Sequence, residues 1–185
     1  MTTTEITNAL NLFGYNQFNK GQLESTSAIL NDKRDICVTM STGAGKSLCF
    51  QLAPIVERQQ GIITSTIVIS PLISLMQDQV KSLNDKIENI ACFLGSAQDD
   101  INVERDALNG KYALIYVTPE KIISEYFRNK LSSLQILSIA VDEAHCLSEY
   151  GNSFRPDYKK LSDLKKYFKV PIITLTATAT KKSKI

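Results

Sequence analysis

Six short apolar segments recur along the chain, each separated from the next by a longer segment with helical patterning. The apolar segments are rich in β-branched residues and cover residues 36–40, 66–70, 89–94, 112–117, 136–141 and 172–176. The helical segments, bounded by Gly and Pro residues, cover 48–59, 72–86, 98–108, 120–131 and 157–168. This alternation is typical of α/β proteins, in which helices cover both faces of a mostly parallel sheet. We therefore predict this fold class, with ligands bound beyond the carboxyl ends of the strands.

A glycine-rich segment directly follows the first predicted strand and leads into the helix predicted at 48–59. It reads Met40-Ser41-Thr42-Gly43-Ala44-Gly45-Lys46-Ser47. A strand, loop and helix of this kind form a phosphate-binding P-loop, in which the backbone N–H groups of residues 42–47 surround phosphate oxygens. Lys46 would reach the β- and γ-phosphates, and the Ser47 hydroxyl would bind Mg²⁺. Met40 stands where the strict pattern has its first glycine, and a chance Gly-Lys-Ser in an ordinary loop is the alternative.

Two adjacent carboxylates, Asp142 and Glu143, follow the predicted strand at 136–141. Beside a P-loop, Asp142 would hold Mg²⁺, and Glu143 would orient or deprotonate the attacking water. The alternative is a pair of strand-end carboxylates that caps a helix. Together with the P-loop, the pair predicts a site for a nucleoside triphosphate and its Mg²⁺, with Lys46, Asp142 and Glu143 as catalytic residues.

Size and composition exclude several other classes of protein. The length of 185 residues suits one domain, and no apolar run approaches the roughly 20 residues that cross a bilayer. The amino terminus lacks the pattern of a signal peptide, so we expect an intracellular protein with no membrane partner. The four cysteines are far apart and His145 is the only histidine, which argues against a zinc site or a disulfide framework.

The charges are unevenly distributed along the chain. The net charge is +2, but nine Lys or Arg residues against two Asp residues occur from Arg155 onward. This excess of positive charge is either a solvated helix face with a basic tail, or a patch that attracts phosphate backbones.

With these motifs in order, the chain resembles the first RecA-like motor domain of RecQ-family DNA helicases, within helicase superfamily two. The resemblance extends from about residue 10 to residue 180. The segment 12–18 with Gln22 resembles the family's adenine-recognition motif, 70–79 its motif Ia, 118–120 its motif Ib and 176–180 its motif III. The resemblance implies a RecA-like P-loop NTPase domain that uses ATP and Mg²⁺. It also implies that Tyr15 and Gln22 bind the adenine, and that Ser70, Pro71 and Thr118 contact nucleic acid.

The segment 146–158 resembles the aromatic-rich loop by which RecQ enzymes sense single-stranded DNA and trigger ATP hydrolysis. Aromatic faces and a cation in one loop, here Tyr150, Phe154 and Arg155, stack bases and neutralise a phosphate. The alternative is that these aromatic side chains pack the loop onto the core. His145 lies between the acidic pair and this loop, and we expect it to couple the metal site to DNA.

The chain departs from the RecQ pattern at several positions. Tyr150 stands where the family usually has Trp, and Asn152-Ser153 replaces its usual His-Asp pair, so stacking and DNA sensing are expected to weaken. Asn19 replaces an Arg that stacks on the adenine. Ala44 replaces a Gly and fits if its φ is negative.

We expect residues 1–185 to form a single helicase ATP-binding domain, with residues 1–30 carrying the adenine-recognition motif. The resemblance implies the ATP-binding half of a 3′-to-5′ DNA helicase that acts on single-stranded or forked DNA. No segment resembles the second RecA-like domain, which supplies an arginine finger, so this chain alone would hydrolyse ATP slowly and is expected to be a fragment of a longer helicase. A DEAD-box-like RNA helicase domain, and an ATP- or nucleic-acid-binding module without turnover, are the alternatives.

Overall fold

The computed structural model describes residues 1–41, 43–95, 101–143 and 163–177. Within them, six parallel strands form one sheet with the order β1-β6-β5-β2-β4-β3. The strands are β1 (Ile36–Thr39), β2 (Ser65–Ile69), β3 (Ala91–Leu94), β4 (Leu114–Val117), β5 (Ile136–Val141) and β6 (Ile172–Thr176). The predicted fold class and all six predicted strands are confirmed, with bounds that differ by no more than two residues.

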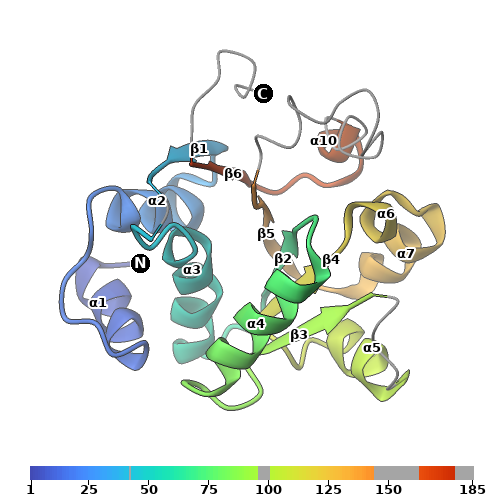
Figure 1. Cartoon of the computed structure of the whole chain (residues 1–185), viewed down its shortest axis with the longest axis horizontal. Coiled ribbons are helices and arrows are strands. Elements are labelled where there is room, and N and C mark those ends of the chain that lie inside the picture. Colours follow the sequence, from blue (N-terminus) through green and yellow to red (C-terminus); the bar gives the residue numbers. More distant parts are fainter. Residues whose placement is uncertain (42, 96–100, 144–162, 178–185) are drawn as a thin grey trace.

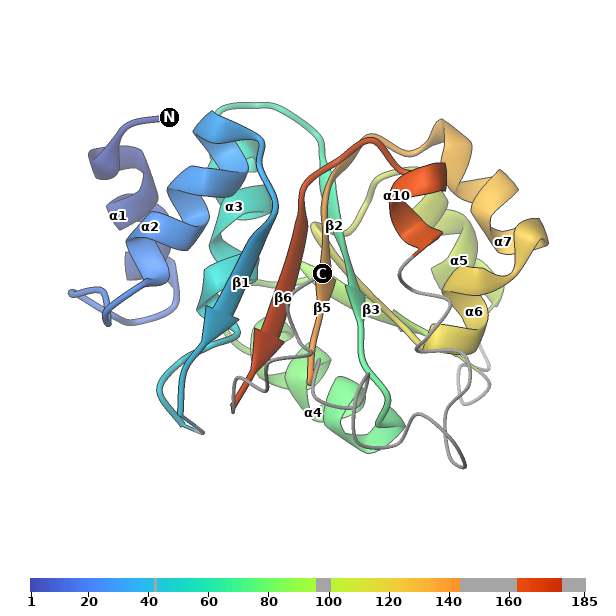
Figure 2. The same cartoon turned by 90° about the horizontal axis from the view of Figure 1, so that it is seen from above.

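Helices cover both faces of this sheet (Figures 1 and 2). Those before β4 are α1 (Thr3–Leu12), α2 (Gln22–Ser27), the π-helix η1 (Ala28–Asp32), α3 (Leu48–Gln59), α4 (Ile73–Asn84) and α5 (Ile101–Leu108). Those after β4 are α6 (Pro119–Ile123), α7 (Glu125–Lys130), the 3₁₀ turn η2 (Leu131–Ser133) and α10 (Leu164–Tyr167). No helix in the described ranges is long and apolar enough to span a membrane.

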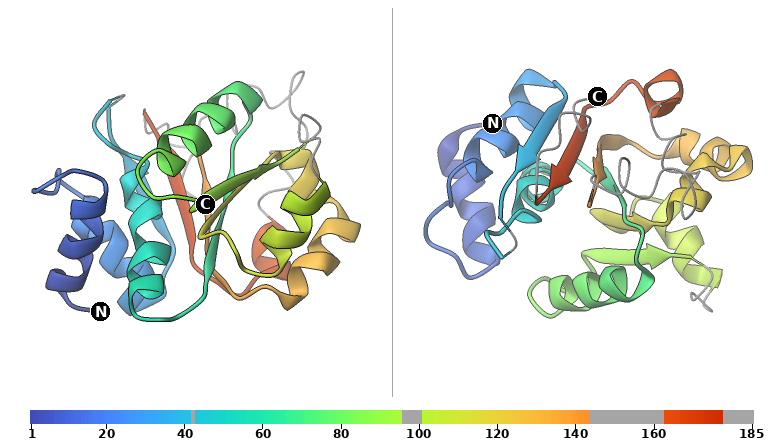
Figure 3. Two further views of the ribbon diagram at one scale, coloured as in Figure 1. Left: turned by 90° about the horizontal axis from the view of Figure 1, so that it is seen from below. Right: turned by 45° about the horizontal axis from the view of Figure 1, so that its top comes forward.

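Alternate residues of the strands build two separate cores. In β4, Leu114 and Tyr116 join the core shared with α1, α3 and α4, whereas Ile115 and Val117 join the core shared with α5, α6 and α7. Successive side chains of a strand point to opposite faces, so a strand with a core on each side has to be apolar throughout. This requirement explains the nearly continuous apolar runs in the sequence. Figure 3 shows the two groups of helices separated by the sheet.

Two helix predictions need correction. The segment 120–131 is not one helix: α6 ends and α7 begins around Ser124, whose backbone is extended (φ −64°, ψ 122°). A single extended residue turns the chain without any Gly or Pro, so the sequence carried no breaker at this point. Of the segment 157–168, residues 157–162 lie outside the described part, and the described remainder holds only the four-residue helix α10.

The amino-terminal helices pack against the helix that follows the glycine-rich segment. Thr2 and Glu5 form a reciprocal capping box that satisfies free N–H groups at the start of α1. Both α1 and α2 contact α3 (Figure 2). Residues 1–30 are therefore part of the same unit as the sheet, with the segment between α1 and α2 held close to the start of α3.

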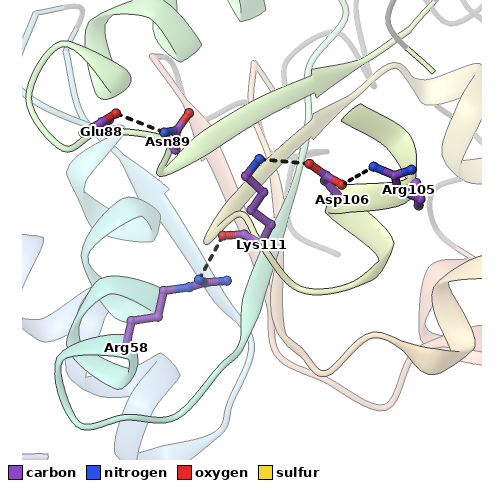
Figure 4. A network of polar contacts seen from close by, with 6 residues as sticks. All are labelled: Arg58, Glu88, Asn89, Arg105, Asp106 and Lys111. Atoms are coloured by element: carbon purple, nitrogen blue, oxygen red, sulfur yellow. Dashed lines mark hydrogen bonds and ion pairs between the residues drawn. The ribbon is translucent and has the colours of Figure 1, made fainter. Parts of the chain in front are cut away.

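Arg58, near the end of α3, ties this helix to the connection between α5 and β4 (Figure 4). Its guanidinium donates to the carbonyl oxygens of Thr64 (3.2 Å), Gly110 (2.7 Å) and Lys111 (3.1 Å). Three carbonyl groups from two distant segments thus share one donor group. Arg105, in the same view, instead forms an exposed ion pair with its neighbour Asp106 (3.2 Å).

Replacing Arg58 with Met should lower the free energy of unfolding by about 2–3 kcal/mol, because three carbonyl groups lose a charged donor. The matched change Arg105→Met should cost less than about 0.5 kcal/mol, since exposed ion pairs contribute little. Urea denaturation of both variants measures the difference. Equal losses would show that the bridge made by Arg58 does not stabilise the fold.

Candidate nucleotide site

The glycine-rich segment and the acidic pair lie at the same edge of the sheet. Segment 40–47 follows β1 and Asp142 follows β5, with β6 between these two strands (Figure 2). Beyond the strands, the N–H of Met40 donates to the carbonyl oxygen of Thr176 (3.3 Å), and the N–H of Asp142 donates to that of Ile69 (2.9 Å). Parallel pairing therefore brings together two motifs that are about a hundred residues apart in the chain.

The backbone of the glycine-rich segment has the curled form that a phosphate-binding loop needs. Gly43 (φ +80°) and Gly45 (φ +82°) are both in the left-handed region, which other residues rarely adopt. Ala44 is not among the described residues with positive φ, so the expectation that alanine fits there is confirmed. Ser47 precedes α3 and its side chain makes no capping hydrogen bond, which leaves the hydroxyl for another partner. Thr42 lies outside the described residues.

Lys46 folds back over the loop that carries it. Its Nζ donates to the carbonyl oxygens of Met40 (3.2 Å) and Ser41 (3.5 Å). These bonds hold a positive charge at the mouth of the loop, where backbone N–H groups and the amino-terminal end of α3 also favour an anion. The geometry suits a phosphate group.

The segment between α1 and α2 contacts the loop through two amide side chains. Nε2 of Gln22 donates to the carbonyl oxygen of Gly45 (3.0 Å), and Nδ2 of Asn19 donates to that of Ala44 (3.1 Å). Oε1 of Gln22 accepts from the N–H of Asn19 (2.8 Å), which fixes the direction of the amide. From the sequence alone, Asn19 is expected only to remove an arginine that stacks on the adenine. In the structure, Asn19 bonds to the loop at Ala44. These two residues are too far apart in the chain for a local sequence pattern to predict the bond.

Tyr15 lies at the rim of a cavity of about 300 Å³ that is also lined by Gly45, Ser47, Gln51 and Gln79. Tyr15 is 46% exposed, and Nζ of Lys86 lies 5.0 Å from the centroid of its ring. Lys86 also donates to the carbonyl oxygen of Phe13 (3.3 Å). It follows α4, and sequence analysis gave it no role. An exposed aromatic face beside the glycine-rich loop suits the stacking of a planar base.

Asp142 is almost fully buried (5% exposed) at the end of β5. Its Oδ1 accepts from the N–H of Glu143 (2.9 Å) and its Oδ2 from Nε2 of Gln79 (3.4 Å). Burial raises the pKa of the Asp142 carboxyl, the charge of Glu143 raises it further, and these two hydrogen bonds and the charge of Lys46 oppose the rise.

Glu143 has φ +51°, an uncommon conformation for a residue with a side chain.

A carboxylate and a hydroxyl at one edge of the sheet are the oxygen donors that Mg²⁺ prefers. Asp142 and Ser47 therefore fit the ion that the sequence predicts.

The residues expected to contact nucleic acid lie farther along the same edge. The N–H of Ser70 donates to the carbonyl oxygen of Val117 (3.2 Å), which joins the ends of β2 and β4. Ser70 is fully buried and its Oγ has no hydrogen-bond partner among the described residues, so its side chain does not form part of the surface. Pro71 and Thr118 line a cavity of about 730 Å³, although the Thr118 hydroxyl is used to accept the Lys121 N–H (3.3 Å) at the start of α6.

Four of the other predicted site residues lie outside the described part of the chain. They are His145, Tyr150, Phe154 and Arg155.

The loop, the acidic pair and the parallel sheet define this protein as a P-loop NTPase domain with a RecA-like fold. Its sequence matches the family model of the DEAD/DEAH box helicases over residues 19–185, and the chain belongs to this family.

Its curated relatives include RecQ-type helicases, which confirms the resemblance stated from the motifs. The chain is 45% identical to the ATP-dependent DNA helicase RecQ of Haemophilus influenzae over 173 residues, which cover 91% of this chain and 27% of that protein. It is 46% identical to the mouse bifunctional 3′-5′ exonuclease/ATP-dependent helicase WRN over 171 residues, which cover 90% of this chain and 12% of that protein. The chain thus spans a minor part of the length of these relatives.

Among solved structures, the crystal structure of the DUF1998 helicase MrfA bound to DNA and AMPPNP superposes with a TM-score of 0.73. The match covers all of this chain and 27% of that chain, at 18% sequence identity. This similarity supports the RecA-like fold independently of the sequence relatives.

Gly45 and Gly43 allow a test of how the loop is packed. A Cβ atom on Gly45 would lie 2.5 Å from Nε2 of Gln22, whereas one on Gly43 would meet nothing within 4 Å. Gly43→Ala should therefore cost about 1 kcal/mol of unfolding free energy from backbone strain alone. Gly45→Ala should cost clearly more, because Gln22 must also move. Equal costs in urea denaturation would contradict the contact between Gln22 and the loop.

Proposed function

We propose that this chain is the ATP-binding half of a RecQ-type 3′-to-5′ DNA helicase. The observation that carries the proposal is that the glycine-rich loop and the buried Asp142 lie at the same edge of the parallel sheet. The names of the relatives, which are ATP-dependent DNA helicases, support the choice of reaction. Because the chain spans 27% of the RecQ protein of Haemophilus influenzae, we infer that a second RecA-like domain completes the motor.

In this proposal each residue of the site has a distinct task. Lys46 exchanges its bonds to the carbonyl groups of Met40 and Ser41 for the phosphates of ATP. Ser47 and Asp142 would hold Mg²⁺, which supplies positive charge to the reacting phosphate. Glu143 orients the attacking water. Tyr15 stacks on the adenine, and Gln22 exchanges one of its amide bonds, to Asn19 or to Gly45, for the adenine.

Single-stranded or forked DNA would pass along the carboxyl edge of the sheet. Pro71 and Thr118 line the cavity at the ends of β2 and β4, where the sugar-phosphate backbone of a DNA strand would lie. Tyr150, Phe154 and Arg155 are proposed to stack bases and neutralise a phosphate, and His145 to pass this contact to the acidic pair. ATP-driven closure and opening of the two motor domains would then move the DNA strand. Because the DNA of a cell lies inside it, the proposed location is intracellular.

The alternatives are an RNA helicase domain and a binding module without turnover. Relatives that are named DNA helicases favour DNA over RNA. Comparing single-stranded DNA with single-stranded RNA as stimulators of ATP hydrolysis in the longer protein separates these two. Intact Lys46, Asp142 and Glu143 argue against a module that cannot hydrolyse ATP.

Replacing Lys46 with Ala should abolish binding of a fluorescent ATP analogue, because the loop loses the cation that neutralises the phosphates. The circular dichroism spectrum should stay unchanged, since Lys46 contacts only carbonyl groups of its own loop in the described structure. Unchanged affinity for the analogue would contradict the assignment of residues 43–47 as a phosphate site.

Replacing Tyr150 or Phe154 with Ala should leave basal ATP hydrolysis intact and reduce its stimulation by single-stranded DNA in the longer protein. A base that stacks on an aromatic side chain contributes about 1–3 kcal/mol, so the DNA concentration for half-maximal stimulation should rise about tenfold or more. Stimulation equal to that of the unaltered protein would assign these aromatic side chains to packing.

A further inference from the structure

Three hydrogen bonds link four side chains beneath the nucleotide site. Nε2 of Gln51 donates to the Tyr116 hydroxyl (3.2 Å), and this hydroxyl donates to Oε1 of Gln79 (2.9 Å). Nε2 of Gln79 then donates to Oδ2 of Asp142 (3.4 Å). We refer to this chain of hydrogen bonds, from Gln51 through Tyr116 and Gln79 to Asp142, as the relay. The four residues come from α3, β4, α4 and the end of β5, so the relay joins segments that are far apart in the sequence.

The relay has one consistent direction. Tyr116 is fully buried, and burial raises the pKa of its hydroxyl, which therefore keeps its single proton. Because the oxygen of this hydroxyl accepts from Gln51, its proton is directed to Gln79. The Gln79 amide must then present its oxygen to Tyr116 and its NH₂ group to Asp142. An ionised carboxylate only accepts hydrogen bonds, so this is the orientation that stabilises the Asp142 anion.

The other end of the relay reaches the glycine-rich loop. The N–H of Gln51 donates to the carbonyl oxygen of Ser47 (3.1 Å), the residue that immediately precedes α3. The relay therefore ends at Asp142 and begins at a residue whose backbone bonds to Ser47, and these are the two residues that fit Mg²⁺. Gln79 and Gln51 also line the cavity that contains Ser47 and Tyr15, so two members of the relay border the candidate nucleotide site.

From these contacts we propose that Gln79 is a positioning residue for Mg²⁺ binding: oriented by Tyr116 and Gln51, it holds the Asp142 carboxylate toward Ser47. This inference rests on the proposed function, because it presumes that Mg·ATP occupies the site. Partners that orient the ligands of a metal ion commonly change its affinity by about 10- to 100-fold. The bond of 3.4 Å is long, so we expect the lower end of this range.

The test is Mg²⁺ titration of nucleotide binding by the complete 185-residue chain, with a fluorescent ATP analogue as the probe. Gln79→Met keeps the length of the side chain and removes the donor. Gln77→Met is the matched control, because Gln77 lies two residues earlier on α4 and is exposed. Tyr116→Phe is a second variant that keeps Gln79 but removes the group that orients it. Analogue affinity is measured both in EDTA and across the titration.

We expect Gln79→Met to raise the Mg²⁺ concentration for half-maximal enhancement of binding about tenfold, with affinity in EDTA unchanged. Tyr116→Phe should shift this midpoint in the same direction by a smaller factor, and Gln77→Met should not shift it. If Gln79→Met and the control Gln77→Met had the same Mg²⁺ midpoint, this inference would be overturned and the proposed function would stand. The same holds if Gln79→Met lost equal affinity for the analogue with and without Mg²⁺. Failure of the unaltered chain to bind the analogue in either condition would instead overturn the proposed function.

Discussion

Parallel pairing of β6 with both β1 and β5 is the constraint on which the candidate site depends. Cys37 pairs with Thr174, and Ala140 pairs with Ile173, so the three strands run in the same direction in register. Their carboxyl ends therefore meet at one edge. If β5 ran the other way, Asp142 would lie at the opposite edge from Lys46. The chemistry of the site is thus a consequence of strand direction, which the two apolar cores enforce from both faces of the sheet.

The loop at this edge is built as much by its surroundings as by its own glycines. Gln22 and Asn19 hold two of its carbonyl groups from outside, and Lys46 holds two more from within. These bonds thus engage the carbonyl groups of Met40, Ser41, Ala44 and Gly45. Helix α4 begins two residues after Pro71 and carries Gln79 to Asp142, so one helix links the predicted DNA edge to the carboxylate predicted to hold Mg²⁺.

The sequence was sufficient for the features that depend on local patterns. Apolar runs located the strands because all of them except β1 are buried on both faces. The glycine-rich segment and the Asp-Glu pair indicated the candidate site because each directly follows a strand. Contacts between distant segments carried no such pattern. The bond of Asn19 to the loop and the approach of Lys86 to Tyr15 arise only when the segment between α1 and α2 packs beside α3 and α4. The relay through Tyr116 arises only when α3, α4 and β4 pack together. The burial of Ser70 has the same origin, since the pairing of β2 with its neighbours determines which strand-end side chains stay exposed.

A crystal structure of the chain with a non-hydrolysable ATP analogue and Mg²⁺ tests the central claim most directly. The account predicts phosphate density within the loop at 43–47, Nζ of Lys46 moved from the carbonyl groups of Met40 and Ser41 to the phosphates, and the metal ion between Ser47 and Asp142. Phosphates bound elsewhere, or Lys46 still bonded to its own loop while the nucleotide is present, would contradict it.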